Sequence, residues 1–256
     1  MKSLVLSLLA IASASAALVE KPVEYEQGGV TLEGFHVYDD AVSGKRPAVL
    51  VIHQWTGLTD YEKMRSRKLA ELGYNVFAAD IYGKGIRPVP PEAAKEAGKY
   101  KGDRTLFRAR LTAALDQLKA DERTDPAKVA AIGYCFGGGG VLELARMGAD
   151  LGGVVSFHGS LDAAPGMEAK DGGVKSKVLV LHGADDPFAP AAQVEALKNE
   201  MAAAKADCKV VLYPDAVHSF THTEAGTDKS KGAAYNEAAD KQSWEEMKAF
   251  LAGLFK

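Results

Sequence analysis

The sequence carries a cysteine enclosed by glycines, in the segment VAAIGYCFGGGG at residues 129–140. The apolar run at 129–132 predicts a buried strand, and residues 141–147 predict the start of a helix. A nucleophile on a sharp turn between a strand and a helix needs glycines two residues to either side, because side chains there would collide with both elements. The turn places Cys135 at a helix N-terminus, where free N–H groups favour a thiolate. The pattern predicts a nucleophile, although a lone cysteine is also typical of a buried packing residue.

An acid and a histidine follow two later apolar runs. Asp186 lies in GADDPFAP at 183–190, and His218 lies in DAVHSF at 215–220. A neutral imidazole can take the proton of a thiol, a carboxylate can orient that imidazole, and the thiolate can attack a carbonyl carbon. Singly, the aspartate is also typical of a helix cap and the histidine of a loop. Asp185 is the alternative acid, less suitable because it lies one residue closer to the strand.

Short apolar runs alternate with amphipathic segments along the chain, which predicts a mostly parallel sheet with helices on both faces. The predicted strands are residues 47–52, 75–79, 129–132, 153–157, 177–181 and 208–213, and the longer predicted helices are residues 59–73, 104–120, 190–204 and 235–255. In such a sheet the functional groups gather in the loops that leave the carboxyl ends of the strands.

Two further segments complete the predicted domain. Gly28-Gly29 predicts a hairpin between strands at 23–27 and 30–38, on which we expect His36 to be solvated. The Pro-, Gly- and Lys-rich stretch at 84–102 predicts an excursion over the active face, with a short helix at 91–97. We find no linker or internal repeat, so residues 18–256 are expected to form a single α/β domain.

The first 17 residues have the pattern of a secretory signal peptide. A lysine at position 2 precedes the apolar run at 4–11, and Ala14-Ser15-Ala16 fits a small-x-small cleavage signal. The apolar run is too short to span a bilayer. We expect cleavage after Ala16 or Ala17 and export, to the periplasm if the host is bacterial, with no membrane contact afterwards.

Composition excludes several classes of function. A formal net charge of −3 gives no electrostatic support for nucleic-acid binding. Two cysteines are too few for a disulfide framework, and Cys135 and Cys208 fall at opposite edges of the predicted sheet, so both should be unbridged. The histidine spacing predicts no metal site, because only His218 and His222 are close, and they would have to lie on a helix to converge.

Together the three motifs GYCFGG, GADDPFAP and DAVHSF resemble the dienelactone hydrolase family (carboxymethylenebutenolidases and relatives), over a stretch from about residue 30 to the C-terminus. The resemblance implies an α/β-hydrolase fold, with a mostly parallel central sheet, helices on both faces and the N-terminal hairpin. It implies a catalytic triad of Cys135, Asp186 and His218. It also implies an oxyanion hole formed by the backbone N–H groups of Trp55 and Phe136. No metal or organic cofactor is implied.

Three positions depart from that family. Gln54 stands where members usually carry a glutamate that takes the proton of the resting cysteine, and glutamine cannot accept a proton at neutral pH. Activation would then fall to His218 alone. Lys84 and His222 stand where the well-studied members hold the substrate carboxylate with two arginines, and they would form a weaker clamp. We therefore expect Gln54, Lys84 and His222 at the substrate-binding site, with the dienelactone substrate itself in doubt.

The sequence thus predicts a secreted, monomeric cysteine hydrolase that cleaves small-molecule esters or lactones through an acyl-thioenzyme. Two alternatives stay open at this point. One is a non-catalytic binding protein that kept the fold, suggested by Gln54. The other is a broad-specificity carboxylesterase unrelated to dienelactone.

Overall fold

The computed structural model describes residues 17–256, so the predicted signal peptide lies outside the described residues except for Ala17. The strands are β1 (Leu18–Gln27), β2 (Val30–Asp39), β3 (Arg46–Ile52), β4 (Asn75–Ala79), β5 (Thr124–Tyr134), β6 (Gly153–Phe157), β7 (Lys177–Gly183) and β8 (Cys208–Tyr213). The α-helices are α1 (Asp60–Ala70), α2 (Glu92–Gly102), α3 (Arg104–Ala120), α4 (Phe136–Arg146), α5 (Ala191–Ala203) and α6 (Glu237–Leu254). Two short 3-10 helices, at Thr223–Ala225 and Lys229–Lys231, precede α6.

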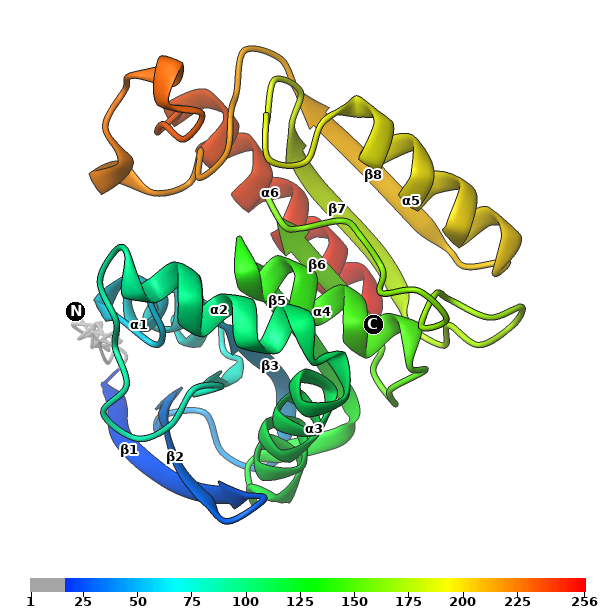
Figure 1. The fold of residues 1–256 in the computed structure, drawn as a ribbon. Coiled ribbons are helices and arrows are strands. Elements are labelled where there is room, and N and C mark those ends of the chain that lie inside the picture. The colour runs from blue at the N-terminus through cyan, green and yellow to red at the C-terminus, as the bar shows by residue number, and fades with distance from the viewer. Residues whose placement is uncertain (1–16) are drawn as a thin grey trace, which may run out of the picture.

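The strands form one eight-stranded sheet within residues 17–256, in the order β1-β2-β4-β3-β5-β6-β7-β8. β1 and β2 pair antiparallel, as do β2 and β4, and the strands from β4 to β8 are all parallel. In Figure 1 the blue hairpin lies at one edge of the sheet and the gold β8 at the other. Because the six consecutive strands from β4 to β8 run the same way, their carboxyl ends meet along one rim.

Helices cover both faces of this sheet. Alternate residues of each central strand point to opposite sides, so Leu50 and Ile52 pack into a core with α3, α4 and α5. Val49 and Val51 pack into a second core with α1 and α6. Figure 1 shows α3 and α4 in front of the strands and the red α6 behind them. The predicted α/β fold, a mostly parallel sheet with helices on both faces and an N-terminal hairpin, is confirmed.

Three local predictions were wrong. The glycine run is already helical, so α4 begins at Phe136 rather than at residue 141. α2 covers Glu92–Gly102 rather than residues 91–97. His36 is buried, with Nε2 2.6 Å from Oδ1 of Asn75, because β2 is not an edge strand but pairs with β4.

None of the helices within residues 17–256 is both long enough and apolar enough to cross a membrane.

Candidate active site

The structure brings the cysteine, the histidine and the acid together at the carboxyl rim of the sheet. Nε2 of His218 lies 3.1 Å from Sγ of Cys135, and Nδ1 of the same ring lies 2.8 Å from Oδ2 of Asp186. Cys135 follows β5, Asp186 follows β7 and His218 follows β8. An imidazole between a thiol and a carboxylate is the arrangement that activates a nucleophile.

Cys135 sits on a strained turn between β5 and α4. Its backbone has φ 53° and ψ −113°, a conformation that L side chains rarely adopt. The turn is tight because glycines allow close approach: a Cβ on Gly137 would fall on the carbonyl oxygen of Ile52, and a Cβ on Gly133 would fall on the carbonyl oxygen of Gly137. The glycines that enclose the cysteine are therefore required by the packing of α4 against β3 and β5.

Electrostatics in the site favour an ionised sulfur. Burial alone would raise the pKa of the Cys135 thiol, but the charge and hydrogen bond of His218 bring that pKa below its ordinary value. Lys101 and the N–H of Phe136 act in the same direction. Burial opposes the charged imidazole, yet the Cys135 thiolate and the hydrogen bond to Asp186 raise the pKa of His218 to about 10. The pair is thus favoured as thiolate and imidazolium.

Asp186, rather than Asp185, is the acid at His218. The Asp186 side chain is buried, and its Oδ1 accepts the N–H groups of Phe188 at 2.8 Å and of Ala189 at 3.3 Å. Burial raises the pKa of this carboxyl, but the His218 hydrogen bond and charge outweigh it, so the pKa is lowered. Asp185 is exposed to solvent. The loop after β7 decides between them: the N–H of Asp185 bonds to the carbonyl of Ala216, while only the Asp186 side chain is turned inward.

The loop after β3 lies against the turn that carries the cysteine. The ring of His53 stacks on Phe136 with centroids 5.7 Å apart, and Gly137 lies against the carbonyl groups of Ile52 and His53. The N–H of Phe136, the residue after the nucleophile, helps to lower the pKa of the Cys135 thiol. The N–H of Trp55 has no backbone acceptor within residues 17–256. The loop that carries Trp55 thus packs on the turn after the nucleophile, and the oxyanion hole of Trp55 and Phe136 stays a prediction.

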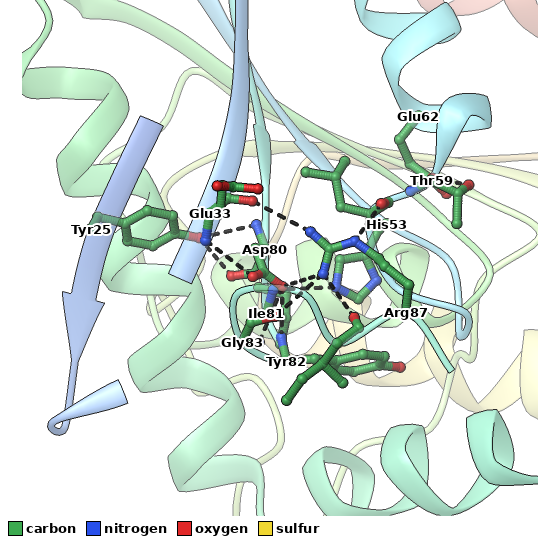
Figure 2. A network of polar contacts seen from close by, with 12 residues as sticks. Tyr25, Glu33, His53, Thr59, Glu62, Asp80, Ile81, Tyr82, Gly83 and Arg87 are labelled. Carbon is green, nitrogen blue, oxygen red and sulfur yellow. Dashed lines mark hydrogen bonds and ion pairs between the residues drawn. The ribbon is translucent and has the colours of Figure 1, made fainter. Parts of the chain in front are cut away.

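A network of polar contacts holds that loop from the side of β4. The buried carboxylate of Asp80 accepts the N–H groups of Tyr82 at 3.1 Å and Gly83 at 3.2 Å, and lies 3.4 Å from the guanidinium of Arg87. Arg87 then donates from Nε to the carbonyl of Leu58 at 2.6 Å. Figure 2 shows Asp80 and Arg87 at the centre of this network, with Thr59 and Glu62 beside it.

The three residues expected to bind substrate are not brought together by side-chain contacts. Gln54 is buried in the loop after β3. The ammonium of Lys84 pairs with Glu24 and with Glu33, both on the N-terminal hairpin. The ring of His222 packs on Tyr61 of α1 with centroids 4.5 Å apart, and burial lowers its pKa, so this ring is neutral.

The remaining histidines at the rim make structural contacts. Nε2 of His182 lies 2.8 Å from the carbonyl of Ala189, and Nε2 of His158 lies 2.8 Å from Oγ1 of Thr221. The His158 ring also packs edge-on against His218, with centroids 5.2 Å apart. Burial lowers the pKa of His158 well below its ordinary value, so it adds no charge there. No group of three candidate metal ligands occurs in the part of the chain that the structure describes.

Three residues near the site were not predicted from the sequence. Lys101, at the end of α2, is exposed, and its positive charge helps to lower the pKa of the Cys135 thiol. Phe188, 61% exposed, lies edge-on to the His218 ring with centroids 5.4 Å apart. Glu62 is fully buried and binds the N–H of Gln54. Only Glu62 left a local signal, the capping box with Thr59, and that signal indicates a helix start rather than a site.

Comparisons with known proteins agree with this geometry. A model of the dienelactone hydrolase family matches residues 32–255. A curated protein from Saccharolobus solfataricus, named "Putative carboxymethylenebutenolidase", is 27% identical over 93% of this chain and 100% of its own. The solved structure of the dienelactone hydrolase-like promiscuous phosphotriesterase P91, from metagenomic libraries, is 39% identical with a TM-score of 0.88, and the match covers 94% of this chain and 100% of that one. A dienelactone hydrolase from Klebsiella pneumoniae, described as putative in its own name, is 23% identical with a TM-score of 0.76 over 92% and 99% of the two chains, and shows the fold alone.

The sheet with its covering helices and the turn that carries Cys135 define an α/β hydrolase. The chain belongs to the dienelactone hydrolase family, whose model spans nearly all of the described residues. It is a hydrolase that acts on ester bonds.

Proposed function

We propose that the chain is a cysteine-nucleophile hydrolase of carboxylic esters or lactones that acts through an acyl-thioenzyme. The observation that carries this proposal is the 3.1 Å separation of Cys135 Sγ and His218 Nε2, with Asp186 on the other nitrogen of the ring. The lowered pKa of the thiol, caused mainly by the charge and hydrogen bond of His218, supports an ionised nucleophile.

The reaction takes two steps. The Cys135 thiolate attacks the carbonyl carbon, and the resulting oxyanion is held by the N–H groups of Trp55 and Phe136. Collapse of this intermediate breaks the ester bond, and the imidazolium of His218 gives its proton to the departing alkoxide. The neutral imidazole then takes a proton from water, hydroxide attacks the thioester, and the carboxylic acid leaves as the thiolate and imidazolium re-form.

Gln54 fits this scheme without a second base. A glutamine side chain cannot take a proton at neutral pH, so no carboxylate at that position competes for the thiol proton. The histidine, oriented by Asp186, is then the acid that protonates the leaving alkoxide in the first step and the base that activates water in the second. Phe188 supplies an exposed apolar surface next to His218, which suits an acyl or alcohol group of apolar character.

The proposal is tested by turnover of a small activated ester with wild type and Cys135→Ala, together with mass spectrometry of the wild type after rapid quenching. We expect loss of turnover in the variant and a covalent acyl adduct on Cys135 in the wild type. Equal rates would refute the nucleophile. The substrate panel should include anionic lactones, neutral esters and a phosphotriester, since the similar protein P91 is named as a promiscuous phosphotriesterase.

We also propose export of the protein. The signal-like residues end where the described domain starts, because β1 begins at Leu18. Cleavage after Ala16 or Ala17 would therefore leave the hairpin intact. Expression of the full chain in a bacterial host, followed by fractionation and N-terminal sequencing, tests this. An uncleaved N-terminus in the cytoplasmic fraction would contradict it.

A further inference from the structure

We propose that Glu62 is a positioning residue that sets the Trp55 N–H in the oxyanion hole. The inference rests on the proposed function and names a residue on which the first step depends. Glu62 lies on the first turn of α1 and does not touch the reacting atoms, so its effect must pass through the loop between β3 and α1.

The Glu62 carboxylate ties the two ends of that loop together. Its Oε1 accepts a hydrogen bond from the N–H of Gln54 at 3.0 Å. Its Oε2 accepts two hydrogen bonds from Thr59, one from the N–H at 2.8 Å and one from the hydroxyl at 2.7 Å. A capping box needs only the contacts between Thr59 and Glu62. The bond to Gln54, eight residues away, is therefore additional to what the start of α1 requires.

The environment of this carboxylate is unusual for a structural acid. Glu62 is fully buried, yet no Lys or Arg within residues 17–256 forms an ion pair with it. Its three partners are all donors, two peptide N–H groups and one hydroxyl, which matches the acceptor-only character of a carboxylate. Burial raises the pKa of Glu62, and those hydrogen bonds oppose that rise. A buried charge that is held only by loop groups is positioned to orient that loop.

The peptide that bears the Trp55 N–H is fixed on each side. Its carbonyl end, Gln54 O, accepts from Nδ1 of His53 at 2.5 Å and from the N–H of Gly57 at 3.2 Å. The preceding N–H is bound by Glu62, and the following carbonyl, Trp55 O, accepts the hydroxyl of Tyr82 at 2.9 Å. With its neighbours bound, the Trp55 N–H keeps one direction and needs no reorganisation when an oxyanion forms.

Two variants separate positioning from helix capping. Glu62→Gln places an amide NH₂ opposite a peptide N–H, which breaks one of the two ties. Glu62→Asp keeps a carboxylate that can cap Thr59 but is too short by one methylene to reach Gln54 as well. Should Glu62→Gln fail to fold, the aspartate variant alone decides the question, because the cap of α1 is retained in it.

Two rates distinguish an oxyanion defect from a general defect of the site. Acylation by an activated neutral ester needs the oxyanion hole, whereas alkylation of Cys135 by iodoacetamide forms no oxyanion. We expect acylation to fall by about 10- to 100-fold in both variants, with alkylation unchanged, since a small displacement of a positioned group costs up to about 100-fold. Asp103→Asn, a carboxylate-to-amide change at the cap of α3, is the matched control and should alter neither rate.

An unchanged acylation rate in Glu62→Asp, or an equal fall of acylation and alkylation, would overturn the inference. Failure of the proposed function has a different signature, because wild type itself would then form no acyl-enzyme or would match Cys135→Ala. That result would overturn both the proposed function and the positioning role. Normal acylation by wild type together with normal acylation by the Glu62 variants would overturn the positioning role alone.

Discussion

Nε2 of His218 lies 3.1 Å from Sγ of Cys135, although 83 residues separate the two along the chain. Along the chain, the strands β6, β7 and β8 come between Cys135 and His218. Because these strands are parallel to β5, the loops after β5 and β8 lie on the same side of the sheet. The contact couples the protonation of the two groups, since each favours the charged form of the other.

The reactivity of the two thiols should differ strongly with pH. The lowered pKa of Cys135 makes it react at a lower pH than an ordinary thiol, and this reactivity is lost as the pH falls through that lowered pKa. Burial and nearby carboxylates raise the pKa of Cys208 to about 11, so it should stay protonated. Iodoacetamide at neutral pH should label one thiol per chain, that of Cys135. Cys208→Ser should leave this label in place and Cys135→Ser should abolish it; two equivalents, or none, would contradict the prediction.

Asp186→Asn should slow ester turnover far more than a surface change would. The amide cannot hold the His218 tautomer and no longer stabilises the imidazolium, so we expect a fall in kcat of about 10²- to 10⁴-fold. The same variant should move the pH midpoint of Cys135 alkylation upward. Asp185→Asn, at the exposed neighbouring position, is the control and should behave as wild type. If Asp185→Asn were the slower variant, the acid would have been assigned wrongly.

Lys101→Gln should weaken the selection of anionic substrates. Lys101 forms no ion pair within residues 17–256, and its charge reaches the Cys135 thiol. An exposed charge acts weakly, so kcat/KM for an anionic ester should fall by about fivefold or less, with a neutral ester unaffected. The thiol pKa should rise at the same time. Lys99→Gln, on the same helix, is the matched control, and an equal loss for neutral and anionic esters would refute the prediction.

Two glycine-to-alanine changes should shift stability in opposite directions. At Gly137 a Cβ would fall on the carbonyl oxygen of Ile52, so alanine should destabilise the fold by about 2 kcal/mol or more. At Gly98, within α2, nothing lies within 4 Å of the added Cβ, and alanine should stabilise by up to about 1 kcal/mol. Urea denaturation of the two variants measures both free energies of unfolding. Equal effects would show that backbone contact at the turn does not control stability.

Much of the fold follows from local pattern. Continuous apolar runs such as residues 47–52 are typical of strands buried on both faces, and their alternation with amphipathic helices favours a parallel sheet. The place of Cys135, Asp186 and His218 just after three of the predicted parallel strands then predicts their meeting at one rim, because parallel strands end on the same edge. Chain order and the two-residue period of a strand were enough for these three residues.

Other features depend on which segments become neighbours, and the sequence by itself did not determine them. A strand pattern does not state its partner, so the burial of His36 followed only from the pairing of β2 with β4. Glu62 has the local signature of a helix cap, and its bond to Gln54 exists because the loop before α1 folds back on itself. The charge of Lys101 reaches Cys135 only because α2 returns over the rim, with Tyr100 packed near Phe136. Contacts between residues distant along the chain arise from packing of whole elements, which no local period encodes.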